Sequence, residues 1–178
     1  MAAIAPSAAE AVRSAGGWLF DQVLAGWDVT VITAEAGHPR PLDILGVRAS
    51  TFDDVIAAPA FGPCLQAIAL PADLYRDDER VRRLVLAAAE AGRAEIRFWG
   101  GVWPADFDGS GDPVSHRLSL AARAFKAQAL AAADLGEALT AETEALTAET
   151  EALTAETEVF RRAELRRPRL AAVSLQNV

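Results

Sequence analysis

The sequence is poor in the residues that most often carry chemistry: it has one cysteine, Cys64, and two histidines in 178 residues. A single cysteine excludes an internal disulfide framework and is typical of a reducing compartment. Neither His38 nor His116 has a partner at zinc-ligand spacing. A G-x-S-x-G elbow and a phosphate-binding P-loop are also missing. The sequence alone therefore predicts no catalytic residue, no cofactor and no metal site.

Long hydrophobic runs and excess positive charge are missing as well. No stretch approaches the roughly 20 apolar residues of a membrane span, and the N-terminus lacks the basic region and apolar core of a secretion signal. The net charge of −8 disfavours binding to nucleic acid, which depends on lysine and arginine to neutralise phosphates. Lys126 is the only lysine, and the arginine and alanine content is typical of a GC-rich bacterial genome. We expect a bacterial, cytoplasmic protein without membrane contact.

The first 103 residues alternate helix and strand signals. Ser7 and Glu10 form a capping box before a helix expected over 7–25. Further helices are expected over 51–58 and 77–91, and strands over 28–33, 47–49, 65–70 and 94–99. This order predicts an α/β head, residues 1–103, that is small, three-layered and Rossmann-like, with three to four mostly parallel strands.

The rest of the chain has a different composition. Residues 104–114 are rich in Gly, Pro and Asp, as in a flexible linker. Over 115–167 almost every residue favours a helix, with a break expected only at Gly136, and Pro168 would end it. The composition therefore predicts a long coiled-coil-type helix, either continuous or folded into a hairpin at Gly136.

Within that segment the heptad EALTAET occurs three times in a row, over 137–157. Because whole heptads preserve helical register, the repeat indicates a spacer that packs against other helices. The register extends beyond the repeat in both directions. The residues expected to mediate homo-oligomerisation are Leu118, Phe125, Leu139, Leu146, Leu153 and Phe160 on one stripe and Ala141, Ala148 and Ala155 on the other.

Three arrangements of this helix stay open. The first is an oligomeric bundle in which each helix contacts two others, with parallel association favoured because glutamate then faces threonine. The second is a hairpin with 115–135. The third is a solvated acidic helix, because the seven glutamates over 137–158 have no lysine among them to form i,i+4 pairs and repel one another.

The C-terminal segment combines arginines with apolar residues. Cations at a helix C-terminus would also suit the macrodipole. The alternative is a docking tail, residues 168–178, next to an arginine collar. Its expected partner-binding residues are Arg161, Arg162, Arg166, Arg167, Arg169, Leu170, Val173 and Leu175.

Two short segments resemble known motifs. The run from Gly26 to Val31, with Glu35 after it, resembles the second strand of dinucleotide-binding Rossmann units, but no G-x-G-x-x-G accompanies it. The oxygens of Asp106, Asp108 and Asp112 are spaced as in the start of an EF-hand calcium loop, but Arg117 stands where the loop needs a glutamate. These three aspartates are the only weak metal candidates.

Taken together, these features predict a non-catalytic scaffold or adaptor, an accessory or stalk subunit of a larger bacterial enzyme complex. It would oligomerise through the heptad-repeat helix and dock one or more protein partners through its tail. The alternative is a small-molecule-binding or catalytic Rossmann-like α/β domain that uses the helix only to oligomerise. That alternative predicts a polar pocket at the carboxyl ends of the strands, around 33–38 and 71–73.

Overall fold

A seven-stranded sheet with strand order β3-β2-β1-β4-β5-β7-β6 forms the centre of the protein. The computed structural model describes residues 1–34, 37–57, 65–92, 94–108, 113–138 and 156–166. The strands are β1 Ala2–Ala5, β2 Thr30–Thr33, β3 Arg48–Thr51, β4 Ala67–Pro71, β5 Glu95–Trp99, β6 Pro113–Arg117 and β7 Thr157–Ala163. Strands β1 to β5 are mutually parallel, whereas β7 pairs antiparallel with β5 and β6 antiparallel with β7.

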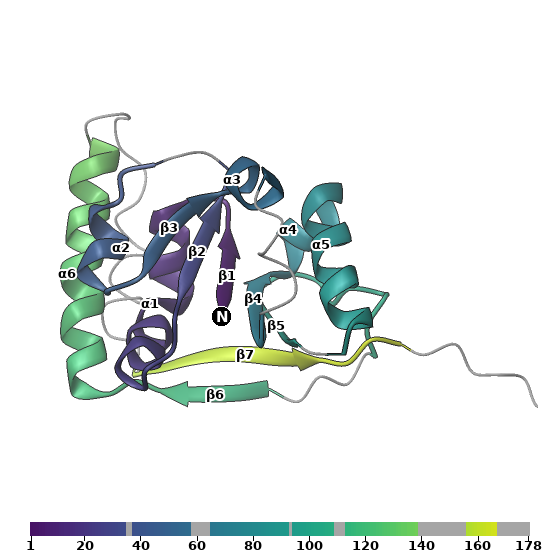
Figure 1. Cartoon of the computed structure of the whole chain (residues 1–178). Coiled ribbons are helices and arrows are strands. Elements are labelled where there is room, and N and C mark those ends of the chain that lie inside the picture. Colours follow the sequence, from purple (N-terminus) through teal and green to yellow (C-terminus); the bar gives the residue numbers. More distant parts are fainter. Residues whose placement is uncertain (35–36, 58–64, 93, 109–112, 139–155, 167–178) are drawn as a thin grey trace, which may run out of the picture.

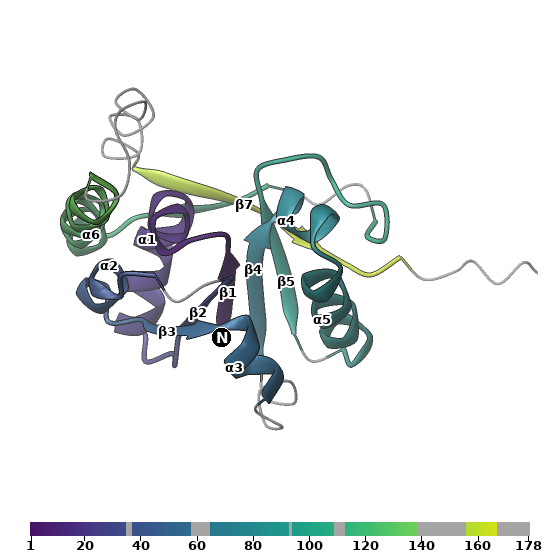
Figure 2. The same ribbon diagram turned by 90° about the horizontal axis from the view of Figure 1, so that it is seen from above.

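Helices cover both faces of the sheet, as Figures 1 and 2 show. One face carries α1 Ala8–Leu24, α2 Arg40–Ile44 and α6 Leu120–Ala138; the other carries α3 Phe52–Ala57, α4 Ala72–Asp77 and α5 Glu79–Glu90. Each face has its own cluster of buried apolar side chains. The predicted α/β architecture with helices on both faces is confirmed, but the prediction of three to four strands within residues 1–103 is wrong: the sheet has seven strands, and β6 and β7 come from the segment expected to be a long helix. No helix of the described residues is long and apolar enough to cross a membrane.

The central strand, β1, was missed by the sequence prediction. All four of its residues are buried, and it pairs in parallel with β2 on one side and β4 on the other. The segment is short and consists of alanines around one isoleucine, Ile4, so neither alternation nor β-branched content marks it as a strand. The helix that follows was predicted well: Ser7 Oγ accepts a hydrogen bond from the backbone N–H of Glu10 at 3.2 Å, and Gly26 after its end has a φ of 87°.

The long helix predicted over 115–167 is wrong. The described part of this segment contains strand β6, helix α6 over Leu120–Ala138, and strand β7. Both strands join the sheet of the N-terminal half, with Phe98 of β5 opposite Arg161 of β7. Residues 139–155, which hold most of the heptad repeat, lie outside the described residues. Phe107, from the segment expected to be a linker, is fully buried and bridges to Leu165.

A buried ion pair connects this C-terminal half to the rest. Lys126 Nζ of α6 lies 2.7 Å from Glu158 Oε1 of β7, and the two side chains are only 4% and 3% exposed. The same carboxylate accepts hydrogen bonds from the backbone N–H groups of Gly17 at 3.0 Å and Trp18 at 2.7 Å in α1. A Cβ atom at Gly17 would clash with the Leu118 side chain, so glycine at this position lets the chain before α6 pack against α1. Three donors therefore compensate the buried carboxylate.

Substituting Glu158→Gln tests this network. The change leaves the Lys126 ammonium buried without a counter-charge, so we expect the free energy of unfolding to fall by about 3–5 kcal/mol. The matched control is Glu156→Gln, two residues earlier, whose ion pair with Arg123 is solvent-exposed and should contribute less than about 1 kcal/mol. Urea denaturation measures both, and equal losses in the two variants would contradict the network's role.

Candidate ligand site at the carboxyl edge

The carboxyl ends of the parallel strands meet at one edge of the sheet. The strand order reverses between β1 and β4, because the chain first builds β2 and β3 on one side of β1 and then β4 and β5 on the other. In open α/β sheets, ligands bind outside the carboxyl ends at such a switch point. The candidate site residues are therefore the side chains that follow β1, β2, β4 and β5.

The turn after β1 offers little chemistry of its own. Its residues are Pro6 and Ser7, and the Ser7 hydroxyl serves as the cap of α1. Glu10, in the first turn of that helix, accepts a hydrogen bond from Ser14 Oγ at 2.6 Å and pairs with Arg13 at 3.3 Å. The side chains of Ser7 and Glu10 therefore form their bonds within helix α1 and its cap.

The turn after β4 brings a carboxylate to the edge. Asp73 lies in the first turn of α4 and pairs with Arg76 at 2.7 Å, and about half of its side chain (52%) is exposed. Gly101, after β5, has a φ of 60°, and a Cβ atom there would lie 2.7 Å from the Asp73 carboxylate. Glycine at this position satisfies the backbone angle and leaves room for the carboxylate. Asp73 is therefore held in place and is still open to a ligand.

A cavity of about 330 Å³ lies beside this turn, and Gly101 also lines it. This volume is at the lower end of the range for small-molecule pockets. Three aromatic residues line it together with two glycines, and Arg161 of β7 contributes a guanidinium that forms no hydrogen bond or ion pair with another described residue. The lining residues are Phe98, Trp99, Gly100, Gly101, Trp103, Val159 and Arg161.

The other predicted pocket segment, 33–38, follows β2. Thr33 is buried at the carboxyl end of that strand, whereas His38 is exposed. Glu35 lies outside the described residues. Of the two predicted segments, the structure therefore places Thr33 and residues 71–73 at the carboxyl edge, and Asp73 is the carboxylate that it describes within them.

The residues predicted for oligomerisation do not share one helix. Leu118 lies just before α6 and is buried, Phe160 is fully buried in β7 against Trp18, and Phe125 of α6 stacks on Phe20 at 4.5 Å. The others lie outside the described residues: Leu139, Ala141, Leu146, Ala148, Leu153 and Ala155.

The described arginines that were predicted to bind a partner lie in different parts of the structure. Arg161 lines the cavity at the carboxyl edge, and Arg162 lies 3.4 Å from Glu95. Arg166 lies 3.6 Å from Asp108, near the opposite edge of the sheet. The remaining members of this set, Arg167, Arg169, Leu170, Val173 and Leu175, lie outside the described residues.

The calcium-like aspartates are engaged in other contacts. Asp106 accepts a hydrogen bond from the Tyr75 hydroxyl at 2.7 Å and pairs with Arg82 at 3.3 Å. Burial and this hydrogen bond raise the pKa of Tyr75, so its hydroxyl stays a donor. Asp108 pairs with Arg166, and Asp112 lies outside the described residues. The described aspartates therefore brace the chain around α4, α5 and the end of β7.

One cluster combines serine, histidine and aspartate without forming a catalytic triad. Asp21 of α1 lies 2.9 Å from His116 Nε2 and accepts a hydrogen bond from Ser119 Oγ at 2.6 Å. Although partial burial raises the pKa of Asp21, the hydrogen bonds from Ser119 and His116 outweigh it and lower this pKa. A triad needs histidine between serine and aspartate, whereas here the aspartate is central. Ser119 Oγ also accepts from the Ala122 N–H, which makes the serine a helix cap.

Comparison with known proteins identifies the fold. No known family and no curated protein matches the chain. Among solved structures, a deacetylase triple mutant of the teicoplanin biosynthetic pathway superposes with a TM-score of 0.67 at 17% identity, covering 93% of this chain and 98% of that one. The A40926 pseudoaglycone deacetylase Dbv21 gives 0.66 at 18% identity over 94% and 98%. The conserved protein TT1542 from Thermus thermophilus gives 0.57 at 17% identity over 96% and 95%. The chain thus has the fold of these deacetylases.

This likeness overturns the prediction of a non-catalytic scaffold and adaptor. Two of the proteins that share the fold over almost their whole length are deacetylases, and deacetylases are enzymes. The coiled-coil helix on which the scaffold depended is not found among the described residues, where α6 ends at Ala138. The sequence misled because Phe160 continues the heptad register of the repeat, although it lies in strand β7. The prediction that the protein is no enzyme followed from the same error.

One of the neighbouring structures is a zinc-inhibited teicoplanin deacetylase, which raises the question whether the residues of this edge fit a metal ion. The described residues contain no group of three or more His, Cys, Asp or Glu side chains that could hold one. At the edge itself, Glu10 and Asp73 are each paired with a nearby arginine, and Asp54 accepts from the Thr51 hydroxyl at 2.7 Å. Zinc needs about four such ligands, or three and a water. The described residues do not fit zinc.

We therefore expect purified protein to retain less than about 0.1 zinc per chain after dialysis, because three or four converging ligands are needed for tight binding. Added zinc at micromolar concentration should leave the thermal midpoint unchanged, since only a ligand that binds the folded state raises it. Elemental analysis and differential scanning fluorimetry measure the two quantities. One zinc per chain surviving dialysis would refute the expectation.

Proposed function

We propose that this chain is a hydrolase of the deacetylase type, which removes an acyl group from the nitrogen of a small molecule at the carboxyl edge of the sheet. The observation that carries the proposal is a half-exposed carboxylate, Asp73, beside a small cavity at the ligand edge of a deacetylase fold. Homo-oligomerisation and a cytoplasmic location remain predictions from the sequence.

The reaction requires a base for water and stabilisation of the developing oxyanion. Water adds to the acyl carbon and gives a proton to the base; the C–N bond then breaks, and the nitrogen leaves with a proton as the free amine. The products are that amine and a carboxylic acid. Among the described carboxylates at this edge, Asp73 lies next to Gly101 and the cavity and could accept the proton. General bases of this kind contribute about 10²–10⁴-fold to rate.

Arg76 is placed to assist in two ways. Its guanidinium lies 2.7 Å from Asp73 Oδ1 and thereby orients the carboxylate. It also brings positive charge next to the position where the oxyanion forms, and such preorganised charge is often the largest contribution to catalysis. The same guanidinium bonds to Asp77 through Nε at 2.8 Å, which limits its movement.

The cavity beside Gly101 would hold the rest of the substrate. Because Gly101 contacts the Asp73 carboxylate and also lines the cavity, a ligand there lies next to the base. The aromatic residues Phe98, Trp99 and Trp103 in the lining of the cavity favour a ring. The guanidinium of Arg161, which is bonded to no other described residue, favours a hydrogen-bond acceptor or an acidic group on the ligand.

The test is acid release from small N-acetylated amino sugars and amino acids, with Asp73→Asn as the variant. We expect wild-type protein to release acetate and free amine, and the variant to lose at least about 100-fold in kcat/KM, since the amide is no base. Asp28→Asn is the matched control, because it removes an exposed aspartate before β2 that pairs with Arg48, at the opposite edge of the sheet from Asp73, and should keep the activity.

Two results would defeat the proposal. The first is a wild-type chain that releases no acetate from any N-acetylated compound of such a panel. The second is activity that survives Asp73→Asn with unchanged kcat/KM, which would place the base elsewhere.

A further inference from the structure

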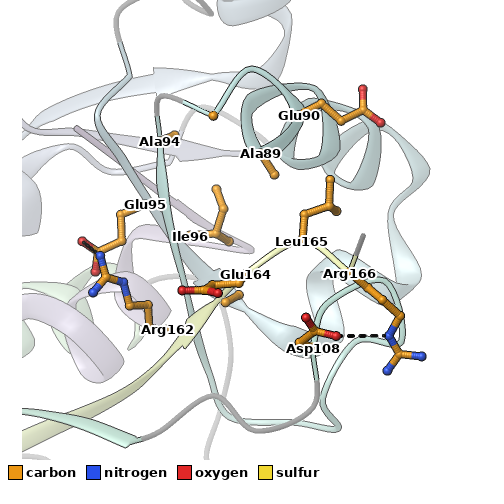
Figure 3. Close-up of a pocket in the computed structure, with 12 residues that line it drawn as sticks. Ala89, Glu90, Ala94, Glu95, Ile96, Asp108, Arg162, Glu164, Leu165 and Arg166 are labelled. Carbon is orange, nitrogen blue, oxygen red and sulfur yellow. Dashed lines mark hydrogen bonds and ion pairs between the residues drawn. The ribbon is translucent and has the colours of Figure 1, made fainter. Parts of the chain in front are cut away.

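A larger cavity lies at the opposite edge of the sheet from Asp73. It has a volume of about 990 Å³ and is bounded by the end of α5, the start of β5 and the chain after β7 (Figure 3). Ile96, Ala89 and Leu165 form an apolar centre, and charged side chains surround it. We call this cavity the amino-edge groove. It takes no part in the proposed reaction.

The charges around the amino-edge groove are not balanced. Arg162 pairs with Glu95 at 3.4 Å, and Arg166 pairs with Asp108 at 3.6 Å. Glu90 and Glu164 also line the groove, and neither carboxylate is bonded to a described residue. Four carboxylates against two guanidinium groups leave a net charge of −2. A ligand with two cations and apolar side chains would match this surface.

The chain itself contains a segment with that chemistry. Residues 167–178 follow directly after Arg166, which lines the groove, and they carry Arg167 and Arg169 followed by Leu170 and Val173. Twelve residues can span roughly 40 Å when extended, at about 3.3 Å each. Because the segment is tethered at the groove, its effective concentration there is in the millimolar range or above.

We propose that the C-terminal segment 167–178 docks in the amino-edge groove of its own chain. Arg167 and Arg169 pair with Glu90 and Glu164, and the apolar side chains that follow cover the centre of the groove. Docking would hold the chain after β7 against α5 and the start of β5. This inference does not depend on the proposed hydrolase activity, because the groove and Asp73 lie at opposite edges of the sheet.

Hydrogen exchange on the full-length chain, followed by mass spectrometry, tests the proposal. We expect the amides of 167–178 to exchange at least about tenfold more slowly than in a free peptide of the same sequence, because docking excludes water and supplies acceptors. The charge reversal Arg167→Glu with Arg169→Glu should remove this protection. Adding Glu90→Arg with Glu164→Arg should restore it, since the pairs are then swapped.

The control is Glu79→Arg, which changes an exposed charge at the other end of α5 and should leave the protection unchanged. Exchange of the wild-type segment at the rate of the free peptide would overturn the proposal. Protection that grows with protein concentration would overturn it as well, because the segment would then dock on a second copy.

Discussion

The buried ion pair between Lys126 and Glu158 is the contact on which the C-terminal half of the fold depends. It joins α6 to β7, and through the N–H groups of Gly17 and Trp18 it joins both to α1. Buried charges are tolerated only when they are paired and hydrogen-bonded. The pair therefore specifies one register for β7 beside β5. If β7 shifted by one residue, Val159 would be buried and Glu158 would be exposed.

The position of β7 determines what lies at both edges of the sheet. Because β7 runs antiparallel to β5, Arg161 of β7 lies opposite Phe98 near the carboxyl end of β5 and lines the cavity beside Gly101. The last residues of β7 leave at the amino edge, where Glu164 and Arg166 line the larger groove. A single strand thus separates a candidate reaction site from a candidate docking site.

The sequence predicted the parts that local signals specify. Helix α1 has its Ser7 cap, and strands close to β2 to β5 were expected from β-branched and apolar runs. The strand β1 could not be recognised from four mostly alanine residues, because its burial comes from its neighbours. Strand β7 was hidden because Phe160 continued the heptad register of the repeat. The sequence indicated Asp73 only as one residue of a strand end, 71–73. Its place in the site depends on the close approach of Gly101, which lies 28 positions later in the chain.

The central claim is that small N-acylated ligands bind at the carboxyl edge. Titrating N-acetylglucosamine into uniformly ¹⁵N-labelled protein tests it most directly, because each backbone amide reports its own surroundings. The account predicts that the largest chemical-shift changes occur at Asp73, Gly100 and Gly101, and that the amides around Glu90 and Glu164 change little. Shifts concentrated at the amino-edge groove, or none at all with this ligand and its N-acetylated amino acid analogues, would contradict it.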